Sequence, residues 1–177
     1  MKLAGAALLM ASVAASTVLA QSPLPRPAPE LEFTSFQGEK VSLAALKGKP
    51  VLVMYFLTTC PHCQDTAEKI APVYAELKSQ GIEVLGLAMD PDAKNRLSGF
   101  VSNHAVKFPV TTATRMEFSR FTGVSVMARF YYPYLLFVDK NGVIRQELQG
   151  NNRPFFANLG SNLYQTFSTL LAEKPTS

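Results

Sequence analysis

The sequence predicts an α/β domain built as a three-layer sandwich around a mixed β-sheet. Two apolar runs, residues 51–57 and 82–89, have the continuity of strands that are buried on both faces, as in a parallel sheet. The helical pattern between them supplies the crossover that parallel neighbours require. Two later runs, residues 134–138 and 143–148, flank an Asn141-Gly142 turn, which favours an antiparallel hairpin. A sheet with both kinds of pairing, covered by helices on both faces, accounts for this order.

Residues 1–20 have the composition of a secretory signal peptide. Lys2 supplies a positive start, and an uncharged run follows, mostly Ala, Leu, Val and Ser, that ends at the small residue Ala20. We therefore expect cleavage and export to the periplasm or extracellular space, with no stable membrane insertion afterwards. The alternative is a membrane anchor, since an uncleaved run of this length just spans a bilayer.

The next segment, residues 21–30, contains four prolines. This composition predicts an extended linker. The folded domain is then expected over residues 31–174, which contain no internal repeat and no low-complexity tract.

The domain is expected to begin with two short strands, residues 31–36 and 41–43, joined by a turn. A short helical turn over residues 44–48 ends at a glycine. After the strand at residues 51–57, a helix is predicted from Pro61, since proline suits the first helical position, to about residue 80. Pro72 is expected to break or kink that helix.

The second half of the chain continues the alternation of helices and strands. Helices are predicted over residues 91–105 and 115–121, with a short extended piece at residues 108–110 between them. A last helix is expected from an Asn151 or Asn152 cap to about residue 173.

Charge and cysteine count limit the function classes. The formal net charge is +4 and no Lys/Arg-rich tract is present, which argues against a nucleic-acid binder. The chain has two cysteines, Cys60 and Cys63, only three positions apart. A disulfide closing so short a loop contributes roughly 2 kcal/mol in the chain-entropy model, against about 4.7 for a loop of 100 residues. Redox chemistry explains the pair better than a structural role.

The segment Cys60-Pro61-His62-Cys63 follows a buried strand and opens a helix, as redox-active pairs do. Unpaired backbone N–H groups and the positive end of the helix dipole favour a thiolate at Cys60. Cys63 lies one turn further in and is expected to resolve the mixed disulfide. The two cysteines are therefore the predicted catalytic residues.

Pro61 and His62, between the cysteines, are predicted to tune the reduction potential. A protonated His62 further favours the Cys60 thiolate. Whatever stabilises the thiolate stabilises the reduced form, which makes the disulfide a stronger oxidant.

Metal binding is an alternative use of the two thiols. A structural zinc site needs four ligands, and the only other histidine is His104, so no zinc site is expected. A copper chaperone that holds Cu(I) with Cys60 and Cys63 stays open, because thiolates favour that ion.

Taken together, these segments resemble the TlpA-like group of exported thiol-disulfide oxidoreductases, in the redoxin (AhpC/TSA-related) family with a thioredoxin-like fold. The resemblance covers about residues 31–173 and is carried by residues 33–43, 46–53, 56–63, 108–110 and 133–142. It implies a thioredoxin-like α/β/α sandwich with an N-terminal strand pair and an inserted β-α unit. It also implies exchange with partner proteins and an external redox-recycling partner. No bound cofactor is expected, because the dithiol carries the two electrons.

The same resemblance implies that Pro133 is a cis-proline that faces the cysteine pair. Tyr132 and Pro133 would then bind the substrate polypeptide. From the residues alone, a trans proline that starts a strand fits Pro133 as well.

One departure from the family pattern concerns proton transfer. Thr66 stands where the family has an acid, six residues after the first cysteine, so this position supplies no carboxylate. The peroxiredoxin pattern P-x-x-x-T-x-x-C would need proline and threonine at positions 53 and 57, where this chain has Val53 and Leu57. An antioxidant peroxidase is therefore the less favoured alternative.

Overall fold

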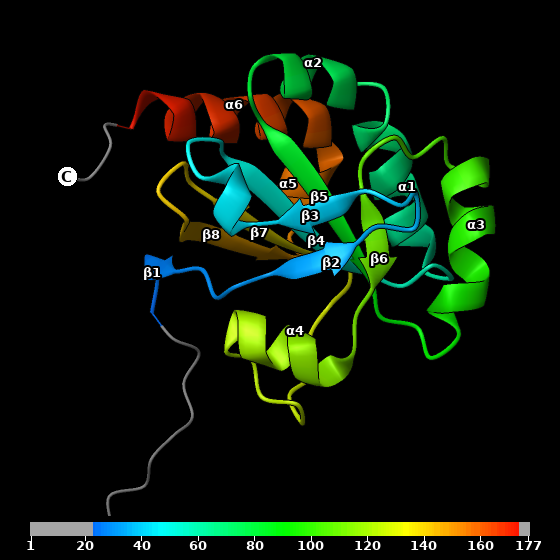
Figure 1. The fold of residues 1–177 in the computed structure, drawn as a ribbon. Coiled ribbons are helices and arrows are strands. Elements are labelled where there is room, and N and C mark those ends of the chain that lie inside the picture. The colour runs from blue at the N-terminus through cyan, green and yellow to red at the C-terminus, as the bar shows by residue number, and fades with distance from the viewer. Residues whose placement is uncertain (1–22, 174–177) are drawn as a thin grey trace, which may run out of the picture.

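The computed structural model describes residues 23–173, so the predicted signal peptide lies outside the described residues. A six-stranded sheet in the order β1-β8-β7-β4-β5-β6 forms the centre (Figure 1). Strand β4 is parallel to β5 and antiparallel to β7, which confirms the predicted mixed sheet. The strands are β1 (Arg26–Pro27), β4 (Val51–Phe56), β5 (Glu83–Ala88), β6 (Val110–Thr112), β7 (Tyr134–Val138) and β8 (Val143–Gln149).

The sheet separates two apolar cores because successive side chains of a strand point to opposite faces. One core contains the helices α1 (Pro61–Ile70), α2 (Tyr74–Ser79), α3 (Ala93–Asn103), α5 (Arg153–Ala157) and α6 (Leu159–Ala172). The other is covered by α4 (Arg115–Thr122), the short helical turn Ala44–Leu46, and the hairpin of β2 (Glu32–Thr34) and β3 (Lys40–Ser42). Figure 1 shows α4 on the side of the sheet away from α1 and α6. The three-layer architecture is confirmed, with the β2–β3 hairpin as part of one outer layer.

The segment that the sequence predicts to be a free, extended linker contains strand β1, which is docked on the sheet. Arg26 and Pro27 pair antiparallel with β8 at the edge of the sheet. The Arg26 guanidinium pairs with Glu147 and donates to the carbonyl oxygen of Thr122. Proline has no N–H, so an edge is where a sheet tolerates it. In its described part, the segment over residues 21–30 is therefore docked rather than a free tether.

The helix after β4 breaks where Pro72 predicts, and its two parts are α1 and α2. The predicted last helix is also two helices, which the sequence analysis missed. Asn152 caps α5, and Asn158 leaves the helical region with φ −125° and ψ 47° before α6 begins. The apolar spacing continues across this break, so periodicity gives no sign of it. Within residues 23–173, no helix combines the length and the hydropathy needed to cross a membrane.

Candidate active site

Strand β4 delivers the chain to the two cysteines. All six of its residues are buried, and a short loop then leads to Cys60, which is the N-cap of α1. The Cys60 Sγ accepts a hydrogen bond from the Cys63 amide at 3.4 Å, which satisfies one of the unpaired N–H groups of the first turn. Pro61 occupies the first turn, where its lack of an N–H costs no helical hydrogen bond.

The two thiols differ in exposure. Cys60 is half-buried, Cys63 is fully buried, and both are free. Burial raises the pKa of the Cys63 thiol far above its ordinary value, and its hydrogen bond with Cys60 adds to the effect. The Leu57 amide opposes these effects without cancelling them. Cys60 is thus the thiol that a partner can reach, and Cys63 is held as a neutral thiol.

Pro133 comes to the same edge of the sheet through the antiparallel pairing of β7 with β4. Tyr134 pairs with Tyr55, so the residue before β7 lies level with the end of β4, from which the cysteine loop leaves. The Tyr132–Pro133 peptide is cis, as the family resemblance implies. The predicted site residues therefore gather from two elements that are far apart in the sequence.

Tyr132 packs against the core cluster that contains Cys63. Its hydroxyl donates to the Met89 Sδ at 3.6 Å. Burial raises the pKa of Tyr132, and the charge of Arg115 works against that rise. Tyr132 is thus a half-buried side chain that links the cysteine region to the loop before β7.

His62 lies with its ring edge against Phe156 of α5, with ring centroids 4.5 Å apart. Thr66 is fully buried, and its hydroxyl donates to the His62 carbonyl oxygen at 2.8 Å. The threonine at the position of the family's acid therefore serves the helix backbone.

Arg115 is a residue that the sequence analysis did not single out. Its guanidinium lies 4.3 Å from the centre of the Phe130 ring and donates to the carbonyl oxygens of Val126 and Ala128. These contacts attach the loop before Tyr132 to helix α4. The sequence does not indicate that Arg115 holds this loop, because an arginine in the first turn of a helix is expected to be a solvated side chain.

Asp90 is a second site residue that was not predicted from the sequence. It follows β5, and its carboxylate accepts hydrogen bonds from the Thr58 amide at 2.7 Å and from the Thr58 and Thr59 hydroxyls at 3.1 and 3.3 Å. Because β4 and β5 are parallel neighbours, their carboxyl ends meet at one edge. Asp90 directly follows the second predicted strand, residues 82–89, so its position in the sequence does indicate that it lies near the end of the first strand.

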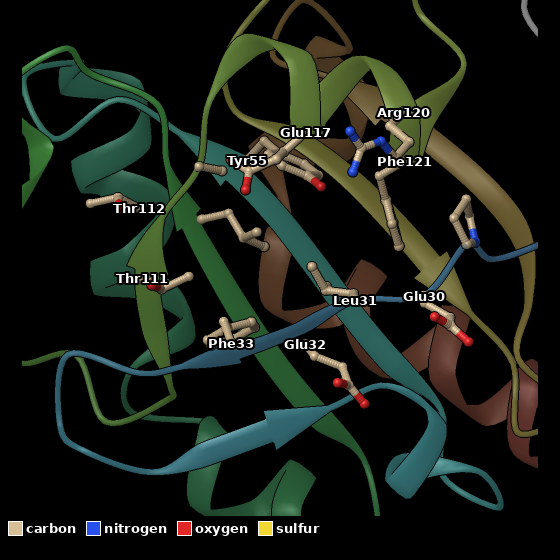
Figure 2. A pocket seen from close by; sticks show the side chains of 13 residues that line it. Glu30, Leu31, Glu32, Phe33, Tyr55, Thr111, Thr112, Glu117, Arg120 and Phe121 are labelled. Carbon is tan, nitrogen blue, oxygen red and sulfur yellow. The ribbon is translucent and has the colours of Figure 1, made fainter.

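A cavity of about 170 Å³ lies on the other face of the sheet, between the β2–β3 hairpin and α4 (Figure 2). Tyr55 and Phe121 belong to its apolar lining, and the charged groups of Glu117 and Arg120 also border it. Neither cysteine lines it. Among residues 23–173, no group of three or more His, Cys, Asp and Glu side chains is arranged to hold a metal ion.

Comparison with known proteins gives a consistent family. The model of the AhpC/TSA family matches residues 24–147. The thiol-disulfide oxidoreductase ResA of Bacillus thuringiensis subsp. konkukian is 28% identical over 123 residues, which cover 70% of this chain and 68% of that protein. A solved thioredoxin-family thiol:disulfide interchange protein of Chlorobium tepidum TLS has a TM-score of 0.68 at 23% identity, over 82% of this chain and 99% of that one. The predicted thioredoxin-like fold is confirmed, and the chain belongs to the AhpC/TSA family.

Proposed function

We propose that the protein is a thiol-disulfide oxidoreductase that exchanges its Cys60–Cys63 pair with partner proteins. The observation that carries this proposal is the pair itself. A reachable sulfur lies at the N-terminus of α1, and a second, fully buried sulfur lies one turn inside. Homologues named thiol-disulfide oxidoreductase ResA support the reaction class.

In the reducing direction, the Cys60 thiolate attacks one sulfur of a partner disulfide. A mixed disulfide forms, and the partner's other sulfur leaves as a thiolate that takes up a proton. Cys63 then loses its proton and attacks the Cys60 sulfur. The intramolecular disulfide forms, and the partner leaves fully reduced. The same steps in reverse oxidise a partner dithiol.

Tyr132 and Pro133 are proposed to bind the partner polypeptide beside the cysteines. Their support is the register of β7 on β4, which brings both residues to the edge where the cysteine loop begins. The Arg115 contacts with the preceding loop would keep this surface in place before a partner arrives.

A separate redox partner is proposed to regenerate the pair. The chain contains no cysteine besides Cys60 and Cys63, so it offers no third thiol for an internal relay. Export is part of the proposal as well, on the composition of residues 1–20.

Trapping with Cys63→Ser tests the proposal. Without the resolving thiol, the mixed disulfide between Cys60 and the partner should accumulate, visible as a band that dithiothreitol removes. Cys60→Ser is the matched control and should trap nothing. Insulin reduction by the wild-type protein should disappear in both variants. Exchange that persists in Cys60→Ser would refute the assignment, and rapid hydrogen peroxide turnover by Cys63→Ser would indicate a peroxidase instead.

A further inference from the structure

The turn that presents Cys60 is held by a carboxylate from another strand. Asp90 lies just past β5 and accepts one backbone and two hydroxyl hydrogen bonds from Thr58 and Thr59. Thr58 is itself buried. Hydrogen bonds to a charged acceptor are stronger than bonds between neutral groups. The cysteine loop is therefore fixed from outside its own helix.

The carboxylate also acts on the site through its charge. Burial and the hydrogen bond with Cys60 are the larger causes of the raised pKa of Cys63, and the negative charge of Asp90 adds to them. Burial is the largest cause of the raised pKa of Tyr132. The charge of Asp90 adds to that rise, and Arg115 of α4 opposes it. A fixed negative charge held against the turn that leads to the cysteines disfavours negative charge on nearby sulfur.

We propose that Asp90 is a positioning residue of the dithiol site, which fixes the turn before Cys60 and makes the pair a stronger reductant. Its contribution opposes that predicted for a protonated His62. This inference rests on the proposed thiol-disulfide exchange and adds a determinant of the potential that lies outside the Cys-Pro-His-Cys segment.

The potential is measured against glutathione. Two glutathione thiols give two electrons and two protons to the Cys60–Cys63 disulfide, whose S–S bond breaks while one glutathione disulfide forms. Where the reduced site ionises, it releases a proton to solvent, and a nearby negative charge makes that release less favourable. Removal of the charge should therefore shift the equilibrium toward the reduced protein.

The decisive variant is Asp90→Asn, which loses the charge but keeps an oxygen that can accept from the Thr58 amide. We expect its equilibrium constant with glutathione to shift toward the reduced protein by about tenfold, equal to about 30 mV. Asp90→Glu keeps the charge and should stay close to the wild-type potential. Asp90→Ala should show the same shift as Asp90→Asn together with slower insulin reduction, because the turn loses its acceptor.

Asp92→Asn is the matched control. Asp92 lies two residues further on, is exposed, and pairs with Arg96 on its own helix turn. Its variant should keep the wild-type potential. An Asp90→Asn protein with an unchanged potential, or an equal shift in Asp92→Asn, would overturn the inference. A wild-type protein without any disulfide exchange would instead overturn the proposed function, so the two failures are distinguishable.

Discussion

Gly150 lies directly against the carbonyl of Tyr132. A Cβ built on Gly150 would lie 2.0 Å from that carbonyl oxygen and 3.1 Å from the Pro133 nitrogen. The Gly150 amide also donates to the Tyr131 carbonyl oxygen at 3.2 Å. The backbone after β8 is therefore packed against the segment that the proposal assigns to partner binding, and only a residue without a side chain fits there.

We expect Gly150→Ala to displace the Tyr132–Pro133 segment, since two backbone groups cannot yield as a flexible side chain can. Misplacement of a binding surface by about 1 Å costs on the order of 100-fold in rate. Insulin reduction should fall toward that extent, with a stability loss of about 1–3 kcal/mol from overpacking. Gly99→Ala, where a Cβ meets nothing within 4 Å inside α3, should keep activity and gain stability. Full activity in Gly150→Ala would contradict this prediction.

Arg115→Lys should raise the KM for a protein substrate several-fold and change kcat less. Lysine keeps the charge but loses the planar group that stacks on Phe130 while it donates to Val126 and Ala128. Arg120→Lys, in the last turn of the same helix, is the control and should behave as wild type. Steady-state kinetics with a disulfide-containing peptide distinguish the two parameters. An effect confined to kcat would argue against a loop-holding role.

The pH dependence of Cys63 follows from its raised pKa. In Cys60→Ser, where Cys63 is the remaining thiol, alkylation by iodoacetamide should be slow at pH 7. The rate should rise about tenfold per pH unit without a plateau up to pH 9.5, because burial keeps the thiol protonated. The same protein in urea should react as an ordinary cysteine. A plateau below pH 9 in the folded protein would show that the thiol ionises normally.

His62→Pro should make the pair more reducing. Loss of the imidazole removes a group that stabilises the thiolate when it is protonated, so the disulfide becomes a weaker oxidant by on the order of 30 mV, or tenfold in equilibrium constant. Proline fits this position because N–H groups in a first helical turn are unpaired. His104→Ala is the control, since His104 pairs with Glu68 rather than with the site. An unchanged or more oxidising His62→Pro protein would contradict the tuning role.

Asp139→Asn should destabilise the fold by about 2 kcal/mol at pH 7. Burial alone would raise the pKa of Asp139, but the amides of Val143 and Asn141 and the Arg145 guanidinium lower it below its ordinary value. The unfolded chain thus binds the proton more tightly, so this stabilisation is present above about pH 4 and is lost as the pH falls through the folded-state value. Urea unfolding at pH 7 and pH 3 should show the gap between wild type and variant shrink. A constant gap would contradict the assignment.

The local parts of the fold were predictable because their signals are local. Buried strands appear as continuous apolar runs, Pro72 breaks the helix that carries it, and Asn141-Gly142 joins β7 to β8. The break at Asn158 and the docking of Arg26 on β8 were not predictable in this way. The docking of Arg26 depends on contacts with residues that are distant in the sequence, and the apolar spacing does not mark the break at Asn158.

By itself the sequence determined the two thiols, their spacing at a helix start, and hence the chemistry available to them. The tertiary structure decided what surrounds them. Asp90 reaches the cysteine loop because parallel strands end at one edge, and Gly150 is required because β8 ends against the Tyr132–Pro133 segment. Hydrogen bonds, burial and close backbone approach depend on distances in space, and residues such as Asp90 and Thr58, 32 positions apart, acquire those distances only when the sheet forms.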